Sequence, residues 1–166
     1  MSDNPVLDVQ NLRKLFPVGR RGLFGGEERL VHAVDDVSFT LAQGEVLALV
    51  GESGCGKSTL ALTLMGLEKP TAGHIYFRGD DVTGYNGRAL KTLRRHVQMV
   101  FQDPYESLNP LMTIGEAVAE PLRVHGLARG KGERDERVRR AMADAGLRPV
   151  ENFLHRRPHE LSGGQR

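Results

Sequence analysis

Hydrophobic and polar residues alternate in three stretches of the first half of the chain, and this period of two is typical of half-buried β-strands. The alternation runs over residues 6–16, 31–41 and 73–78. Residues 46–50 (VLALV) form a continuous apolar run, which indicates a strand buried on both faces. Residues 97–101 (VQMVF) predict one more strand.

Helical patterns replace the alternation elsewhere. Hydrophobic residues recur every three to four positions in residues 57–67, from residue 113 up to a kink or stop at Pro121, and in residues 133–145. Residues 87–95 predict a short basic helix. The side chains expected to face a core are Leu60, Leu64, Leu67, Ile114, Val118, Leu122, Val138, Ala141, Met142 and Ala145.

The composition is that of a soluble globular domain. The chain has 166 residues, 39% hydrophobic and 27% charged, which excludes disorder of the whole chain. No apolar run approaches the ~18 residues of a membrane span, and none near the start predicts a signal peptide. A single cysteine excludes internal disulfides. Because the net charge is only +2, we expect no nucleic-acid partner, and we expect a cytosolic location.

Residues 51–58 (GESGCGKS) fit the pattern G-x-x-x-x-G-K-[ST] of a phosphate-binding loop, between an expected strand and an expected helix. Small residues let backbone N–H groups turn inward around an anion, and the helix N-terminus adds a partial positive charge. Lys57 can reach the β- and γ-phosphates of a nucleotide, and the Ser58 hydroxyl is an oxygen ligand suited to Mg²⁺. The residues expected to bind the phosphates are Gly51, Ser53, Gly54, Cys55, Gly56, Lys57, Ser58 and Thr59.

Simpler interpretations of this segment exist. A glycine-rich turn between a strand and a helix, with Lys57 exposed to water, could have the same sequence without binding a phosphate. Cys55 lies near a helix N-terminus, where thiols can act as nucleophiles, but it occupies a free position of the motif and has no neighbouring histidine in the sequence. We therefore expect no catalysis by Cys55.

A second glycine-containing motif, residues 161–165 (LSGGQ), lies near the other end of the chain. Ser162 is a favourable residue for a helix N-cap, and Gly163-Gly164 would expose backbone N–H groups at a helix start, which makes a second anion site. With this motif the chain resembles the ATPase subunits of ABC transporters, whose signature it matches over Leu161, Ser162, Gly163, Gly164 and Gln165.

The resemblance implies that two subunits assemble head to tail, so that the signature motif of each closes over the ATP held by the loop of the other. It also implies that Gln102 contacts Mg²⁺ and the attacking water, and that Phe16 stacks against the adenine, with Phe24 a weaker alternative. A competing interpretation takes Asp103 as the magnesium-binding carboxylate of a different nucleoside triphosphatase. Pro104 and the signature motif argue against it.

Several further sequence segments resemble those of the oligopeptide and dipeptide importer ATPases, including residues 101–110 (FQDPYESLNP), 112–116 (MTIGE) and 157–162 (RPHELS). This resemblance implies ATP and Mg²⁺ as cofactors and attachment to the cytoplasmic face of the membrane. The implied partners are a second ATPase subunit, two membrane permeases and an extracytoplasmic solute-binding protein. Import of nickel or another small solute is the alternative, as is an ABC-type ATPase of DNA repair or translation that serves no transporter.

The expected fold is α/β: a P-loop NTPase of the ABC type with an N-terminal antiparallel β portion and a helical subdomain. We expect the β portion and P-loop core in residues 1–102 and the helical subdomain in residues 103–166. In the family, the Walker B strand with its catalytic glutamate and the switch histidine follow the signature. The general base is therefore expected to be absent from this chain, and we expect the chain to be a fragment with the C-terminal half of the core missing.

Overall fold

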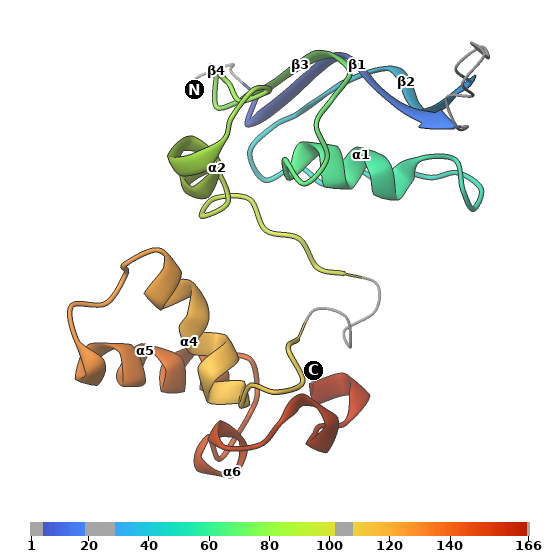
Figure 1. Cartoon of the computed structure of the whole chain (residues 1–166). Helices are drawn as coiled ribbons and strands as arrows, with labels where there is room; N and C mark the ends of the chain where they lie inside the picture. The colour runs from blue at the N-terminus through green and yellow to red at the C-terminus, as the bar shows by residue number, and fades with distance from the viewer. Residues whose placement is uncertain (1–4, 19–28, 102–107, 166) are drawn as a thin grey trace, which may run out of the picture. The chain divides into compact units, whose positions relative to one another are not determined.

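The computed structural model describes residues 5–18, 29–101 and 108–165. The chain divides into two compact units, residues 1–98 and 99–166, each of which has its own hydrophobic core (Figure 1). Each unit is described below by itself.

The first unit is built on a four-stranded antiparallel sheet in the order β2-β1-β3-β4. The strands are β1 (Leu7–Val18), β2 (Arg29–Leu41), β3 (Ala72–Phe77) and β4 (Asp80–Asp81). The three strands predicted from alternating residues are therefore confirmed. β1 occupies an interior position because it pairs with β2 on one edge and with β3 on the other.

An irregularity in the pairing of β1 with β2 is stabilised by side chains that tolerate a left-handed backbone. Asn11 (φ 47°) and Asp36 (φ 57°) both adopt this conformation, which Asn and Asp accept more readily than other residues. The amide Nδ2 of Asn11 donates to Oδ1 of Asp36 at 3.0 Å, and the backbone N–H of Asn11 donates to Oγ of Ser38 at 2.8 Å. These bonds connect the two strands where the regular ladder is interrupted.

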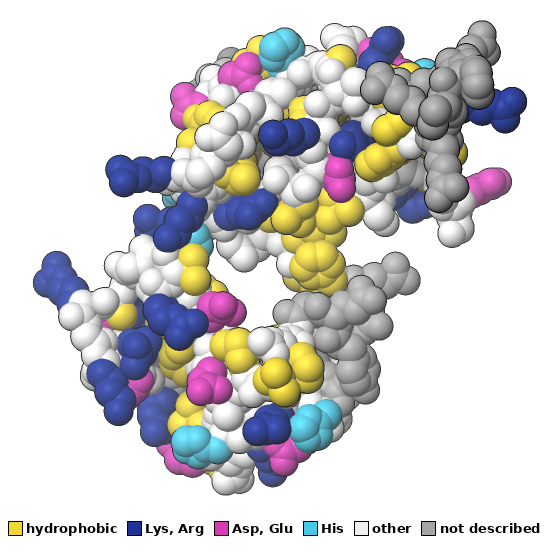
Figure 2. Space-filling view, in the orientation of Figure 1, with side chains coloured by type: hydrophobic (Ala, Val, Ile, Leu, Met, Phe, Trp, Pro, Cys, Tyr) yellow, Lys and Arg dark blue, Asp and Glu magenta, His cyan; other side chains and the backbone are white. Residues whose placement is uncertain are grey.

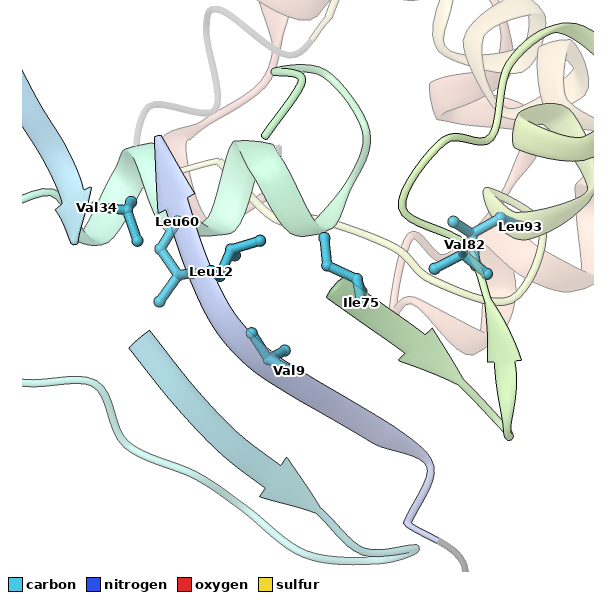
Figure 3. Packing of buried hydrophobic residues seen from close by; sticks show 7 residues of the cluster. All are labelled: Val9, Leu12, Val34, Leu60, Ile75, Val82 and Leu93. Carbon is cyan, nitrogen blue, oxygen red and sulfur yellow. The ribbon is translucent and has the colours of Figure 1, made fainter. Parts of the chain in front are cut away.

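The core of this unit lies between the sheet and α1 (Lys57–Leu64), which runs along one face of the sheet (Figure 1). Figure 3 shows buried side chains from β1, β2, β3 and α1, together with Val82 just after β4 and Leu93 of α2 (Gly87–Leu93). Burial of such aliphatic side chains stabilises the unit by about 1.5–3 kcal/mol for each that is fully covered. The buried cluster consists of Val9, Leu12, Val34, Leu60, Ile75, Val82 and Leu93.

The helix α1 is shorter than the periodicity predicts. It ends at Leu64, because Gly66 adopts a left-handed conformation (φ 62°) that terminates the helix. The guanidinium of Arg94 then donates to the carbonyls of Met65 and Gly66, at 3.4 and 3.1 Å, and so satisfies the last turn. The expectation that Leu67 continues the buried helical face is wrong, since its side chain is exposed.

Residues 46–50 and 97–101 are not strands, which corrects the sequence-based prediction. Both segments are irregular, and the side chains of Val46, Val50 and Val100 are 93%, 89% and 95% exposed. A strand buried on both faces exists only where neighbouring strands pair with it and other layers cover it. The described part of the chain supplies no such neighbours to either segment.

The second unit is helical, with α4 (Ile114–Val124), α5 (Lys131–Asp144), α6 (Glu151–Leu154) and two 3₁₀ turns, Pro158–Glu160 and Gly163–Gln165. Val138 and Met142 are buried as predicted, but Ala141 and Ala145 are exposed, because the covered stripe of α5 is narrower than expected. Pro121 does not end α4, which continues to Val124. The core of this unit consists of Ile114, Val138, Met142, Val150, Phe153 and Leu161.

In the described residues, we find no helix that is both long and apolar enough to cross a membrane.

Candidate nucleotide-binding site

The phosphate loop, residues 51–56, leads directly into the first turn of α1. Gly56 is the N-cap residue of α1 and has φ 94°, ψ 0°, and Gly54 has φ 84°. A Cβ atom built on Gly56 would lie 1.9 Å from the carbonyl oxygen of Ala33 in β2. The backbone of the loop therefore rests against β2 at a distance that only glycine allows.

Lys57 folds back across this loop. Its Nζ donates to the carbonyl oxygens of Gly51 (2.7 Å) and Glu52 (2.6 Å) and lies 3.4 Å from Sγ of Cys55. These oxygens carry only partial charges, and a phosphate oxygen is a stronger partner for an ammonium group. The arrangement holds the ammonium at the mouth of the loop, from which it can exchange a carbonyl for a phosphate.

The start of α1 is electrostatically suited to an anion. The first turn of α1 carries no acidic side chain, so nothing in that turn competes for the partial positive charge of the helix N-terminus. Ser53 and Ser58 are exposed, while Thr59 is half-buried and its carbonyl accepts a hydrogen bond from the hydroxyl of Thr63. The Ser58 hydroxyl is thus available to a ligand at the helix start.

Phe16 lies in β1 of the same compact unit and is half-buried. Its backbone pairs with Val31 of β2, and the ammonium of Lys14 lies 4.6 Å from the centre of its ring. β1 also packs on α1 through Leu12 and Leu60. The strand that carries Phe16 and the helix that the loop opens therefore share one core.

Three residues considered in the sequence analysis, Gln102, Asp103 and Phe24, lie outside the described residues. The clefts of the first unit that are lined by Ile75, Tyr76 or Phe77 of β3 have no residue of the phosphate loop in their walls. The described residues also contain no cluster of three or more His, Cys, Asp or Glu that could hold a metal ion by itself.

The signature motif belongs to the second unit, where Leu161 anchors it. Leu161 is buried in the core of that unit, whereas Ser162, Gly163, Gly164 and Gln165 are exposed. The backbone N–H of Ser162 donates to Oε1 of Gln165 at 3.1 Å, and that of Gln165 donates to the carbonyl of Ser162 at 3.0 Å. A Cβ on either glycine would meet nothing within 4 Å, so the backbone of this single 3₁₀ turn is open to a partner.

A hollow of about 570 Å³ lies between α4 and α5 in the second unit. Its lining is charged with both signs, including Glu116, Glu120, Arg123, Arg134 and Arg139. Figure 2 likewise shows acidic and basic side chains interspersed on the visible face. On α5, Oε1 of Glu133 lies 3.9 Å from Nη1 of Arg137, one turn further along the helix.

The profile of the ABC transporter family matches residues 34–166. The chain therefore belongs to the ABC transporter family, and the predicted P-loop ATPase fold of the ABC type is confirmed.

Among curated proteins, the chain is 46% identical over 162 residues to the oligopeptide transport ATP-binding protein AppF of Bacillus subtilis, covering 97% of this chain and 48% of AppF. It is 48% identical over 162 residues to the glutathione import ATP-binding protein GsiA of Pectobacterium atrosepticum, covering 98% of this chain and 25% of GsiA. The chain thus spans about half the length of the first relative and a quarter of the second.

Among solved structures, the fold is similar to the dimeric ATP-binding cassette MJ0796 in a post-hydrolysis state bound to ADP and Pi. The TM-score is 0.75 at 29% identity, covering 96% of this chain and 64% of that one. A second dimeric structure of MJ0796, described as a bacterial ABC transporter cassette, gives a TM-score of 0.72 at 28% identity with the same coverage.

Proposed function

We propose that the whole protein is the ATP-binding and ATP-hydrolysing subunit of an ABC importer for di- or oligopeptides. The observation that carries this proposal is the loop that Gly56 seats against β2, with Lys57 held across its mouth, in a chain similar to importer ATPases over nearly its whole length. The names of the relatives supply the cargo class, because oligopeptides and glutathione are both peptides.

In this proposal different residues bind different parts of Mg-ATP. Backbone N–H groups from Gly54 to Thr59 surround the phosphates, and Lys57 exchanges its carbonyl partners for phosphate oxygens. The exposed Ser58 hydroxyl and Gln102 would hold Mg²⁺, whose remaining ligands would be phosphate oxygens and water. When bound, Mg²⁺ neutralises the charge that develops during phosphoryl transfer. The ring of Phe16 would stack against the adenine.

The signature motif serves a second subunit in the same proposal. Its open backbone at Gly163 and Gly164 can donate hydrogen bonds to the ATP held by the phosphate loop of the partner. A head-to-tail dimer therefore uses both anion-binding elements, and the dimeric state of the similar MJ0796 cassette supports it. Two permeases and an extracytoplasmic solute-binding protein would complete the importer, with this subunit on the cytoplasmic face of the membrane. We further assign residues 1–102 to the P-loop core and residues 103–166 to the helical subdomain.

The decisive experiment is Lys57→Ala in the full-length protein. We expect ATP binding to weaken by at least about tenfold, because the loop loses its only charged donor to the phosphates. Peptide uptake by cells that carry only this variant should fall to the level of a deletion strain. The measurements are titration calorimetry with Mg-ATP and uptake of a labelled dipeptide.

Lys91→Ala, which changes an exposed lysine on α2, is the matched control and should leave both quantities unchanged. Unchanged ATP turnover in Lys57→Ala would contradict the ATPase assignment. Normal peptide uptake together with lost nickel uptake in the deletion strain would instead reassign the cargo.

A further inference from the structure

The segment that follows α1 is fastened to β1 just before Phe16. The backbone N–H of Thr71 donates to the carbonyl of Arg13 at 2.8 Å, and the hydroxyl of Thr71 accepts from the backbone N–H of Leu15 at 3.0 Å. These residues are more than 50 positions apart in the chain. The strand that carries Phe16 is thereby tied to the linker at the end of the helix that the phosphate loop begins.

Lys14 lies at the centre of this connection. Its ammonium is 2.8 Å from Oε2 of Glu68, donates to the carbonyl of Lys69 at 2.9 Å, and lies 4.6 Å from the centre of the Phe16 ring. The Lys14 side chain is only 12% exposed. A lysine that gives up most of its hydration needs partners for its charge, and here a carboxylate, a carbonyl and an aromatic face supply them.

We propose that Lys14 is a positioning residue for the base of the bound nucleotide, acting through Phe16. This inference rests on the proposed function, since it requires that Phe16 be the adenine platform. The ammonium lies over one face of the ring, and in this proposal the base stacks on the opposite face. Because Glu68 and Lys69 hold the ammonium in place, the plane of the ring is held with it.

The same contacts fix the ring of Phe16 relative to the phosphate loop, so that the two proposed parts of the nucleotide site keep a constant separation. The phosphate loop opens α1, and the segment containing Glu68 and Lys69 follows that helix by a few residues. Lys14 connects this segment to the ring of Phe16, so the base platform is held relative to the helix that binds the phosphates. A cation on one face of the ring also draws electron density from it, which strengthens stacking of an electron-rich purine on the other face.

If Lys14 served only to form a salt bridge with Glu68, its replacement would have a different effect on ligand binding. Ion pairs that are partly open to water contribute little to stability, and such a contribution would affect every ligand alike. A positioning role must instead affect ligands that carry a base and spare ligands that consist only of phosphate. Inorganic tripolyphosphate provides that comparison, because it can occupy the phosphate loop without reaching Phe16.

The experiment measures the affinity of the full-length protein for Mg-ATP and for Mg-tripolyphosphate by titration calorimetry. Lys14→Met keeps the length of the side chain and removes its charge. We expect it to weaken ATP binding by about three- to tenfold, from the usual strength of a partly desolvated cation–π contact, and to leave tripolyphosphate binding unchanged. Lys14→Arg, which keeps a cation over the ring, should restore most of the ATP affinity. Lys91→Met is the matched control and should change neither value.

A second test uses Phe16→Leu, which removes the ring. In that background Lys14→Met should cause no further loss of ATP affinity, because the residue acts through the ring. Equal losses for ATP and tripolyphosphate, no loss for either, or a further loss in the Phe16→Leu background would each overturn the proposal. A wild-type protein that binds no ATP would overturn the proposed function itself, which is a separate and recognisable result.

Discussion

Two glycines of the phosphate loop offer a test of why the loop has its sequence. Gly54 and Gly56 share a left-handed backbone, with φ 84° and 94°. They differ in their surroundings, since a Cβ on Gly54 would meet nothing within 4 Å whereas one on Gly56 would lie 1.9 Å from the carbonyl oxygen of Ala33. The first position therefore requires glycine for its backbone conformation alone, and the second requires it also for space.

We expect Gly54→Ala to lower the free energy of unfolding of the protein by about 1–2 kcal/mol, the usual cost of placing a Cβ in the left-handed region. Gly56→Ala should cost more and should also abolish ATP binding, because the loop must move away from β2. Chemical denaturation without nucleotide, followed by ATP titration, measures both effects. Equal costs at the two positions would show that the contact with Ala33 does not hold the loop.

The first turn of α4 is stabilised by a reciprocal pair of hydrogen bonds. The backbone N–H of Glu116 donates to the Thr113 hydroxyl at 3.2 Å, and the Glu116 carboxylate accepts from the backbone N–H of Thr113 at 2.8 Å. The backbone N–H and then the hydroxyl of Thr113 lower the pKa of Glu116 below its ordinary value of 4.5. The carboxylate therefore contributes stability above pH 4.5, and this contribution is lost as the pH falls through the lowered pKa of the folded state.

Replacing Thr113 with Val should remove the N-cap and destabilise the protein by about 1 kcal/mol at neutral pH. The loss of stability below pH 4.5 should become slightly shallower in this variant, because the hydroxyl no longer lowers the pKa of Glu116 while the backbone N–H of residue 113 still does. Thermal melting between pH 3 and 7 measures both effects. Thr113→Ser keeps the hydroxyl and should behave like the wild type, and an acid profile of Thr113→Val that matches the wild type would contradict the assignment.

The elements that could be predicted from the sequence are those whose signal is local. The strands β1, β2 and β3 and the start of α1 follow from alternation and from the phosphate-loop motif, and the structure confirms them. The expected strand at residues 46–50 was wrong for the described chain. An entirely apolar segment forms a buried strand only when neighbouring strands pair with it, and the described residues include no such neighbours. The Lys14–Glu68 contact could not be predicted, since no short motif connects two residues 54 positions apart.

At the scale of the whole molecule, residues 46–50 form an exposed apolar segment that pairs with no strand of the described chain. Val46 and Val50 are 93% and 89% exposed, and Leu47 and Leu49 are about half exposed. An apolar, unpaired segment of this kind is a template for pairing with another chain. The similar MJ0796 cassettes are longer than this chain, which covers 64% of them, so a protein of cassette length has further residues that could cover the segment.

One pair of substitutions should therefore reduce self-association of the 166-residue chain but destabilise a protein of full cassette length. In the 166-residue chain, we expect self-association at micromolar concentration, and Val46→Lys with Val50→Lys should reduce it, because charges on an unpaired segment oppose strand pairing. In the full-length protein the same pair should lower the free energy of unfolding by several kcal/mol, because it would place two charges in a buried strand.

Val18→Lys, at an exposed position at the end of β1, is the control and should have little effect in either protein. Light scattering measures the first effect and chemical denaturation the second. If the pair of substitutions changes self-association no more than Val18→Lys does, the segment at residues 46–50 is not the surface through which the chains associate.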